Sequence, residues 1–122
     1  MLGYLAERED DLDEAARRTI EAIEVEAKLR KDEFLGYAFV FAADLVQRRG
    51  DARGAARLLG AADAAFTRAV VVPQTQEAER RDDVRARLDD ELGSERTALE
   101  TEGAALDLEA AANLAVSALA RV

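Results

Sequence analysis

The spacing of apolar positions predicts helices almost throughout the chain. In the segment 12–30 apolar residues recur every three or four positions, which is the period of one helix face. The segment 33–49 is apolar on nearly all sides between Phe34 and Val46, a pattern typical of a helix packed between neighbours. The only candidate strand, VVV at 70–72, is too short to build a sheet. The pattern therefore predicts an all-α fold.

Residues that cap or end helices divide the chain into seven predicted helices. We expect small polar residues to cap them, namely Asp10 or Asp11, Asp32, Asp51, Thr75, Ser94 and Asp107. Glycines and the single proline end them, at Gly50, Pro73, Gly93 and Gly103. The predicted helices are 1–9, 12–30, 33–49, 52–69, 76–92, a short one after Ser94 that fails at Gly103, and a last one after Asp107. The last helix should turn one face inward, formed by Leu108, Ala111, Ala112, Ala115, Ala118 and Leu119.

An internal repeat accounts for the small residues in RRGDARGAARLLGAADA at 48–64. A shift of 40 places LGYLAEREDDLDEAARR (2–18) over AADLVQRRGDARGAARL (42–58). Self-similarity at such a period indicates stacked helical hairpins. Small side chains such as Ala55 and Ala62 would then lie where two helices cross, because ridge-in-groove packing brings their axes within about 8–10 Å. The alternative is an alanine-rich bundle with chance similarity.

The repeated segments resemble the tetratricopeptide repeat, in which a Leu-Gly pair opens the first helix and a small alanine marks the second. The resemblance covers residues 2 to about 67, with a period of 40 instead of the usual ~34 and with Thr19 at a position where a large residue is expected. It implies antiparallel helical hairpins stacked as a short right-handed superhelix with C-terminal capping helices. The single domain would comprise repeat units at about 1–31 and 32–69 and tail helices at about 76–121.

The order of motifs in the second half is similar to the C-terminal region of bacterial LuxR- and AfsR-type regulators, which carry an ATPase domain ahead of degenerate tetratricopeptide repeats. The matching residues are RLLGAA (57–62), Pro73 in a loop, Leu92-Gly93 at a helix end, and the segment Leu108 to Ala111. The chain has no glycine-rich phosphate loop and no DNA-reading helix. The resemblance therefore implies the sensor or scaffold end of such a regulator.

Composition argues against catalysis and against several kinds of partner. Histidine and cysteine are both absent, which removes the commonest general base, the commonest metal ligand and thiol chemistry. The net charge of −9 disfavours direct nucleic-acid binding. The longest apolar run, at 34–43, is too short to span a membrane. We expect no enzyme, no metal and no cofactor, and a cytoplasmic protein that does not engage membranes.

A binding surface is the better candidate for function. In tetratricopeptide arrays the first helix of each hairpin lines a concave face, which the resemblance maps onto Tyr4, Glu7, Arg8, Asp44, Gln47 and Arg48, with Tyr37 and Phe41 extending it. The C-terminal helices or a second subunit could instead cover these positions. We expect a protein-interaction or scaffold module that binds a protein or peptide. The alternative is a small-molecule sensor pocket between the repeats and the tail helices, which a deep apolar pocket containing Tyr37 would favour.

The start of the chain predicts self-association. The predicted first helix, 1–9, is much shorter than its counterpart in the second unit, and repeat stacks need a cap over an open end. Apolar residues would be left exposed there, namely Met1, Leu2, Leu5, Ile20 and Ile23. We expect a twofold dimer through the N-terminal hairpin. The alternative is a monomer whose C-terminal helix folds back over that end, and light scattering at micromolar concentration separates the two.

Replacing Ala55 or Ala62 by leucine should lower the free energy of unfolding by about 1–3 kcal/mol, because the repeat places both alanines at tight helix crossings. Urea denaturation followed by circular dichroism measures the change. Unaltered stability in both variants would mean that the repeat alignment is accidental.

Overall fold

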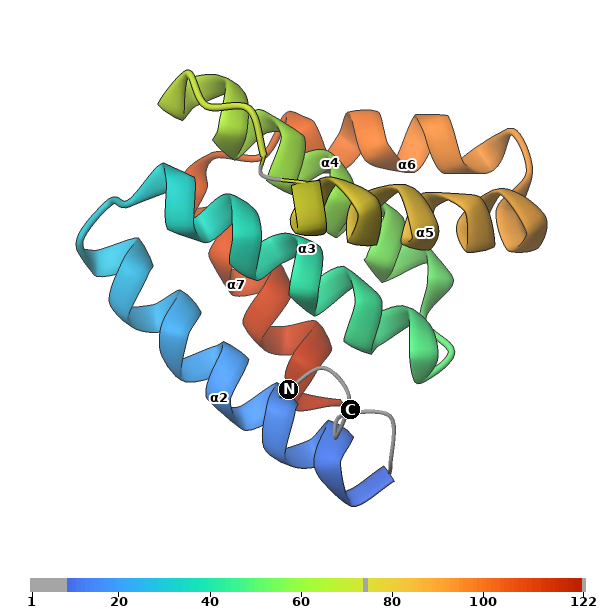
Figure 1. Ribbon diagram of the computed structural model, residues 1–122, viewed down its shortest axis with the longest axis horizontal. Coiled ribbons are helices and arrows are strands. Elements are labelled where there is room, and N and C mark those ends of the chain that lie inside the picture. The colour runs from blue at the N-terminus through green and yellow to red at the C-terminus, as the bar shows by residue number, and fades with distance from the viewer. Residues whose placement is uncertain (1–8, 74, 122) are drawn as a thin grey trace.

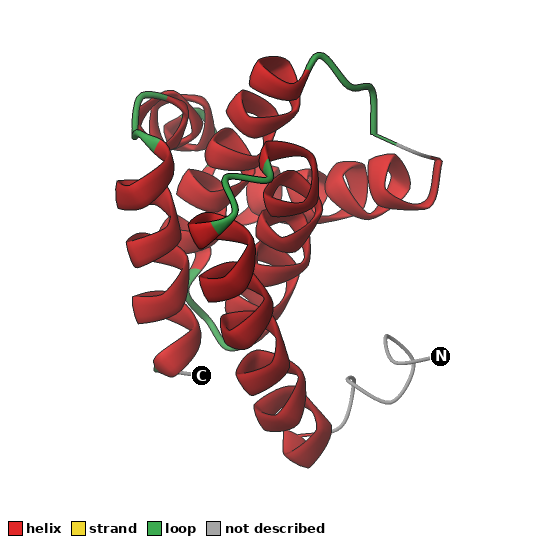
Figure 2. Ribbon diagram, turned by 90° about the vertical axis from the view of Figure 1, so that its left-hand side faces the viewer, coloured by secondary structure: helices red, strands yellow, loops and turns green. Residues whose placement is uncertain are grey.

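The structure, a computed structural model, describes residues 9–73 and 75–121, and six α-helices make up its regular elements (Figures 1 and 2). They are α2 Glu9–Lys28, α3 Asp32–Arg48, α4 Ala52–Ala69, α5 Thr75–Leu92, α6 Glu95–Ala104 and α7 Leu108–Ala120. No strand occurs among these residues, so the predicted all-α class is confirmed for them. The predicted helix at 1–9 lies outside the described residues except for its last position.

Two of the expected caps are confirmed. The Asp51 carboxylate accepts a hydrogen bond from the backbone N–H of Gly54 at 2.9 Å and so caps α4. The Asp107 carboxylate accepts from the N–H of Ala110 at 2.7 Å and caps α7. Each bond satisfies one of the N–H groups that the first turn of a helix leaves without a partner.

The other expected caps are wrong. Asp10 and Asp11 lie inside the first turn of α2. Asp32 and Thr75 are the first residues of α3 and α5 rather than their caps. Acidic side chains in a first turn are stabilised by the helix dipole without capping it, so sequence alone confuses the two roles. Ser94 makes no capping hydrogen bond because its backbone is helical (φ −66°, ψ −18°), whereas a capping residue needs an extended backbone.

Helix α3 is the centre of the fold. It contacts α2, α4, α5 and α7, as its apolar sequence predicts (Figure 1). Buried side chains cover most of its circumference, including Leu35, Phe39, Val40, Leu45 and Val46. Full burial of one such side chain contributes about 1.5–3 kcal/mol, so α3 supplies much of the hydrophobic core.

The small residues of α4 lie where α4 crosses two other helices, α3 and α6. Ala55 and Ala62 are fully buried, and the most extensive helix contact in the fold is the one between α3 and α4. Gly60 faces α6 instead of α3, because a Cβ added to it would lie 1.9 Å from the carbonyl oxygen of Glu100 in α6. A Cβ on Gly103 of α6 would lie 1.8 Å from the carbonyl oxygen of Arg57 in α4. The backbones of α4 and α6 therefore touch at these two glycines, and α6 runs one residue past Gly103 instead of failing there.

Helix α7 returns to pack against α2 and also contacts α3 and α4. Its predicted inner face is confirmed, since Ala111, Ala112, Ala115, Ala118 and Leu119 are buried and Leu108 is half-buried. Ile23 of α2 is fully buried and Ile20 is half-buried. The C-terminal helix thus folds back over the flank of α2. The predicted contacts of Met1, Leu2 and Leu5 lie outside the described residues.

None of the helices in residues 9–73 and 75–121 combines the length and the apolar character needed to cross a membrane.

Substituting alanine at Gly60 or Gly103 should lower the free energy of unfolding by about 2–4 kcal/mol, because the added methyl group meets rigid backbone on the facing helix and the helices must separate. Thermal and urea unfolding of each variant measure the loss. Gly93→Ala is the control, since its Cβ would meet open space and only the strain of a positive φ (59°) remains. A loss at Gly60 or Gly103 no larger than the loss at Gly93 would contradict the close contact.

Candidate functional site

The predicted binding residues that the structure describes all belong to α3, and we call them the α3 face: Tyr37, Phe41, Asp44, Gln47 and Arg48. The remaining predicted members, Tyr4, Glu7 and Arg8, lie outside the described residues. Helix α5 lies across the α3 face, and its side chains contact Phe41, Asp44 and Gln47. Tyr37 instead packs edge-on against Phe66 of α4, with ring centroids 5.0 Å apart.

A buried carboxylate forms the centre of this contact. Asp44 is only 5% exposed, and three arginines donate hydrogen bonds to it. Its Oδ1 accepts from Arg48 Nε at 3.0 Å and from Arg87 Nη2 at 2.6 Å, while its Oδ2 accepts from Arg80 Nη1 at 2.9 Å. Burying a charge is unfavourable unless the charge is paired and hydrogen-bonded, and here both oxygens are. Two of the three donors come from α5, so the docking of α5 stabilises Asp44 in its buried position.

The same two arginines engage the neighbours of Asp44 on α3. The guanidinium of Arg80 lies over the ring of Phe41, 5.0 Å from its centroid, which adds a cation–π attraction. Arg87 Nε donates to the side-chain oxygen of Gln47 at 2.8 Å, and the Gln47 amide in turn donates to Glu91. The ring of Phe41, the carboxylate of Asp44 and the amide of Gln47 thus all contact arginine side chains of α5.

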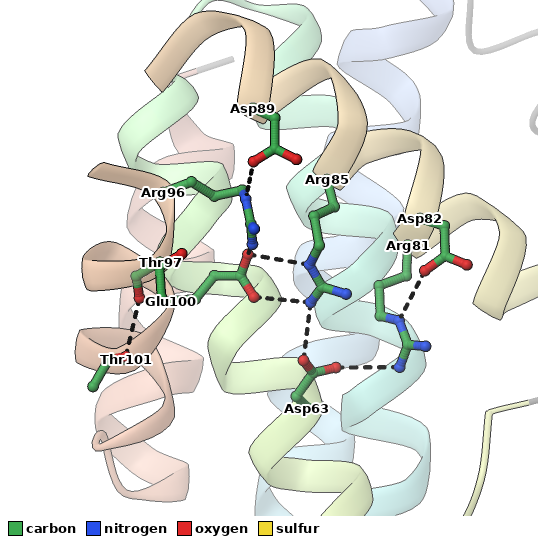
Figure 3. Close-up of polar contacts among 9 residues, drawn as sticks. All are labelled: Asp63, Arg81, Asp82, Arg85, Asp89, Arg96, Thr97, Glu100 and Thr101. Carbon is green, nitrogen blue, oxygen red and sulfur yellow. Dashed lines mark hydrogen bonds and ion pairs between the residues drawn. The ribbon is translucent and has the colours of Figure 1, made fainter. Parts of the chain in front are cut away.

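A second ionic network holds the other flank of α5 (Figure 3). Arg85 donates to Glu100 of α6 at 2.8 Å and to Asp63 of α4 at 2.9 Å, and Arg81 pairs with Asp63 at 3.3 Å. Arg96 of α6 pairs with both Asp89 of α5 and Glu100. The network therefore links α4, α5 and α6 through side chains that point toward one another between the helices.

These surroundings shift the pKa values of the two arginines that Glu100 pairs with. Burial by itself would lower the pKa of Arg85, but the carboxylates of Glu100 and Asp63 outweigh it and raise the pKa above its usual value. For Arg96 the hydrogen bond to Asp89 is the largest cause, and Glu100 adds to it, so its pKa is also raised. Both guanidinium groups stay charged throughout the accessible pH range.

Few apolar side chains anchor α5. Its buried residues are Val84 and Leu88, whereas α3 and α4 each bury side chains along their whole length. Arg80 and Arg87 flank this apolar pair on the side of α3, and Arg81 and Arg85 flank it on the side of α4 and α6. Helix α5 is therefore held largely by charged side chains, whose attraction salt screens.

A groove of about 600 Å³ lies between α2 and α7. Its apolar lining comes from Ile23, Ala27, Leu108, Ala112 and Val116, and its polar lining from Glu24, Lys28, Arg30, Glu109 and Asn113. Tyr37, which was expected to mark a sensor pocket, is not part of this lining. Glu26 of α2 has a pKa raised by burial, but it does not line the groove either. Among the described residues, no group of three or more acidic, histidine or cysteine side chains is placed to hold a metal ion.

No family model, no curated protein and no solved structure matches the chain. The assignment of a function therefore rests on the site itself.

The structure gives Asp44 and Phe41 partners that sequence reasoning missed. The arginines of α5 alternate with acids at helical spacing, a pattern typical of ion pairs along one helix surface. In the structure Arg80 and Arg87 reach α3, and Arg85 reaches α4 and α6. A signal was present, because Arg80 and Arg87 are seven residues apart and share a face with Val84.

Asp44→Asn should lower the free energy of unfolding by about 1–3 kcal/mol, because it removes the charge that binds the α5 arginines while leaving them in place. Asp13→Asn is the matched control, since it removes an exposed carboxylate paired with Arg49 and should change stability by less than about 0.5 kcal/mol. Urea unfolding at low salt measures both variants. Equal, small losses would mean that Asp44 does not hold α5.

Proposed function

We propose that this protein is a non-catalytic protein-interaction module whose α3 face binds a helix. The observation that carries the proposal is the docking of α5, in which Phe41, Asp44 and Gln47 each engage an arginine of one helix. Helix-in-groove recognition uses the same elements, namely apolar anchors spaced along one helix face and polar groups that fix its register. In this proposal α5 occupies, within the same chain, the surface that a partner helix would bind.

The proposal also covers the fold of the repeats and the class of protein to which the module belongs. We take α2, α3 and α4 to be part of a short tetratricopeptide-like right-handed superhelix, with α7 as a capping helix, in a bacterial signalling or transcriptional regulator of the LuxR and AfsR types. The complete burial of Ala55 and Ala62 supports this, since the repeat alignment assigns both to tight crossings. Such a module would act in the cytoplasm as a scaffold, without catalysis and without direct contact to nucleic acid.

The chemistry of α5 defines the partner that fits. The partner helix carries an arginine four residues before and another three residues after an apolar residue, as Arg80 and Arg87 stand to Val84, followed by a second apolar anchor like Leu88. Its arginines would replace those of α5 on Asp44. Because α5 must leave first, the apparent affinity is reduced by the fraction of molecules in which α5 is undocked.

A peptide with the sequence of residues 75–92 tests the proposal when it is added in trans to the full chain. Fluorescence anisotropy should detect weak binding to the unaltered protein and about tenfold tighter binding to the R80A/R87A variant, whose own α5 competes less well. Adding Asp44→Asn to that variant should abolish binding. A peptide in which both arginines are replaced by alanine should fail to bind.

The matched control is the R17A/R18A variant, which removes two exposed arginines from α2 that pair with Glu14. It should bind the peptide as the unaltered protein does. If the R80A/R87A variant keeps its helical circular dichroism and still does not bind the peptide, the α3 face is not a helix-binding surface.

A small-molecule sensor remains the second candidate, and the groove between α2 and α7 favours it. Its volume of about 600 Å³ is within the range of small-molecule sites, and apolar and polar side chains line it in equal number. It also lies between a helix of the proposed repeat and a tail helix, where a sensor pocket was expected.

A further inference from the structure

The large apolar side chains that are exposed within the described residues gather at one end of the molecule, which we call the apolar end: Val25, Leu29, Phe34, Val70 and Val72. Val25 and Leu29 share a face at the end of α2, Phe34 lies in the first turn of α3, and the two valines follow α4. An ion pair between Arg68 and Asp32, at 3.3 Å, fastens the end of α4 to the start of α3. Figure 1 shows the α2–α3 turn and the end of α4 on the same side.

The side chains of the apolar end are highly exposed. Val70 is 91% exposed and Val72 is 86% exposed, and a group of large exposed apolar side chains marks an interaction surface more often than single ones do. Val70 is also a β-branched residue in the left-handed conformation (φ 56°) that ends α4, a position that usually holds glycine. Val70 thus combines an unfavourable backbone conformation with an almost fully exposed side chain.

The charges at this end indicate what covers it. Three cations at this end form no ion pair with another described residue: Lys28, Arg30 and Lys31. All the described arginines except Arg30 do form one. Glu24 and Glu33 are exposed carboxylates in the same stretch and are also unpaired among the described residues. The end thus mixes both signs in a chain whose net charge is −9. A strongly charged partner would meet like charges there, but a second copy turned about a twofold axis can place each lysine opposite a glutamate.

We propose that the apolar end is the surface through which two copies of this chain associate about a twofold axis. The valines, Leu29 and Phe34 form the buried centre, and the lysines and glutamates of the two copies pair around it. This inference is independent of the proposed function. It places the interface at the C-terminal end of α2, whereas the self-association predicted from sequence uses the start of the chain and the flank of α2 around Ile20 and Ile23.

Sedimentation velocity and light scattering between about 1 and 200 μM test the proposal. The unaltered chain should form dimers, and the L29S/F34S/V72S variant should dissociate at least tenfold more readily while it keeps its helical circular dichroism, because all three side chains are already exposed. The control variant L2S/L5S changes the start of the chain and should dimerise normally. A monomer at every concentration, or a dimer that only L2S/L5S disrupts, would overturn the proposal.

A charge exchange tests the twofold pairing. K28E/K31E and E24K/E33K should each dimerise at least tenfold more weakly than the unaltered chain, because like charges then face each other across the axis. An equimolar mixture of the two variants should recover a dimer that contains one chain of each. Failure of the mixture to associate, or a mass above that of a dimer, would exclude this pairing.

Cross-linking supplies a third readout, since the natural chain has no cysteine. Leu29→Cys should form a covalent dimer under mild oxidation, and the control Arg17→Cys, which is exposed on the same helix, should not. Equal cross-linking of both would show random collision and contradict the interface.

Discussion

The contact between the backbones of α4 and α6 at Gly60 and Gly103 fixes the positions of the remaining helices. Neither helix can carry a side chain there, so α6 lies directly on α4. This position brings Glu100 to the place where Arg85 and Arg96 reach it, which sets one flank of α5. It also sets the starting point of the chain that returns as α7 to cover α2. One steric constraint between two glycines therefore determines both the arginine contacts of α5 and the closure of the core by α7.

Two kinds of attachment coexist in the fold. Helices α3 and α4 are held by burial of apolar side chains, which is insensitive to salt and demands close packing. Helix α5 buries only Val84 and Leu88 and otherwise depends on charged contacts to Asp44, Asp63 and Glu100. This difference separates the apolar core from a helix held mainly by charge, and that helix lies on the α3 face.

The sequence predicted the features that depend on short stretches of chain. Apolar residues on all sides of the segment 33–49 predicted that α3 lies between neighbours, and the Gly50-Asp51 step predicted the boundary between α3 and α4. Asp10, Asp11 and Ser94 failed as caps because a cap depends on the backbone conformation of the residue itself, which its identity does not determine. Only the α3 residues of the site were predicted, and the α5 residues that contact them were not. Asp44 could be found by repeat spacing, but the direction in which Arg80 and Arg87 extend depends on how α6 places α5 on α3 and α4.

The two attachments have a consequence for motion within the native state. Helix α5 lies between the loop that contains Pro73 and the turn at Gly93, so it can detach while α4 and α6 stay joined. Such a sub-global opening would break ion pairs and uncover the two buried side chains of α5, Val84 and Leu88, and its free energy would lie below that of complete unfolding. Amide hydrogens of α5 would then exchange with solvent sooner than those of α3, and the difference would grow as salt weakens the arginine contacts. In that opened state Asp44 becomes a solvated anion on an intact helix, ready for another cation.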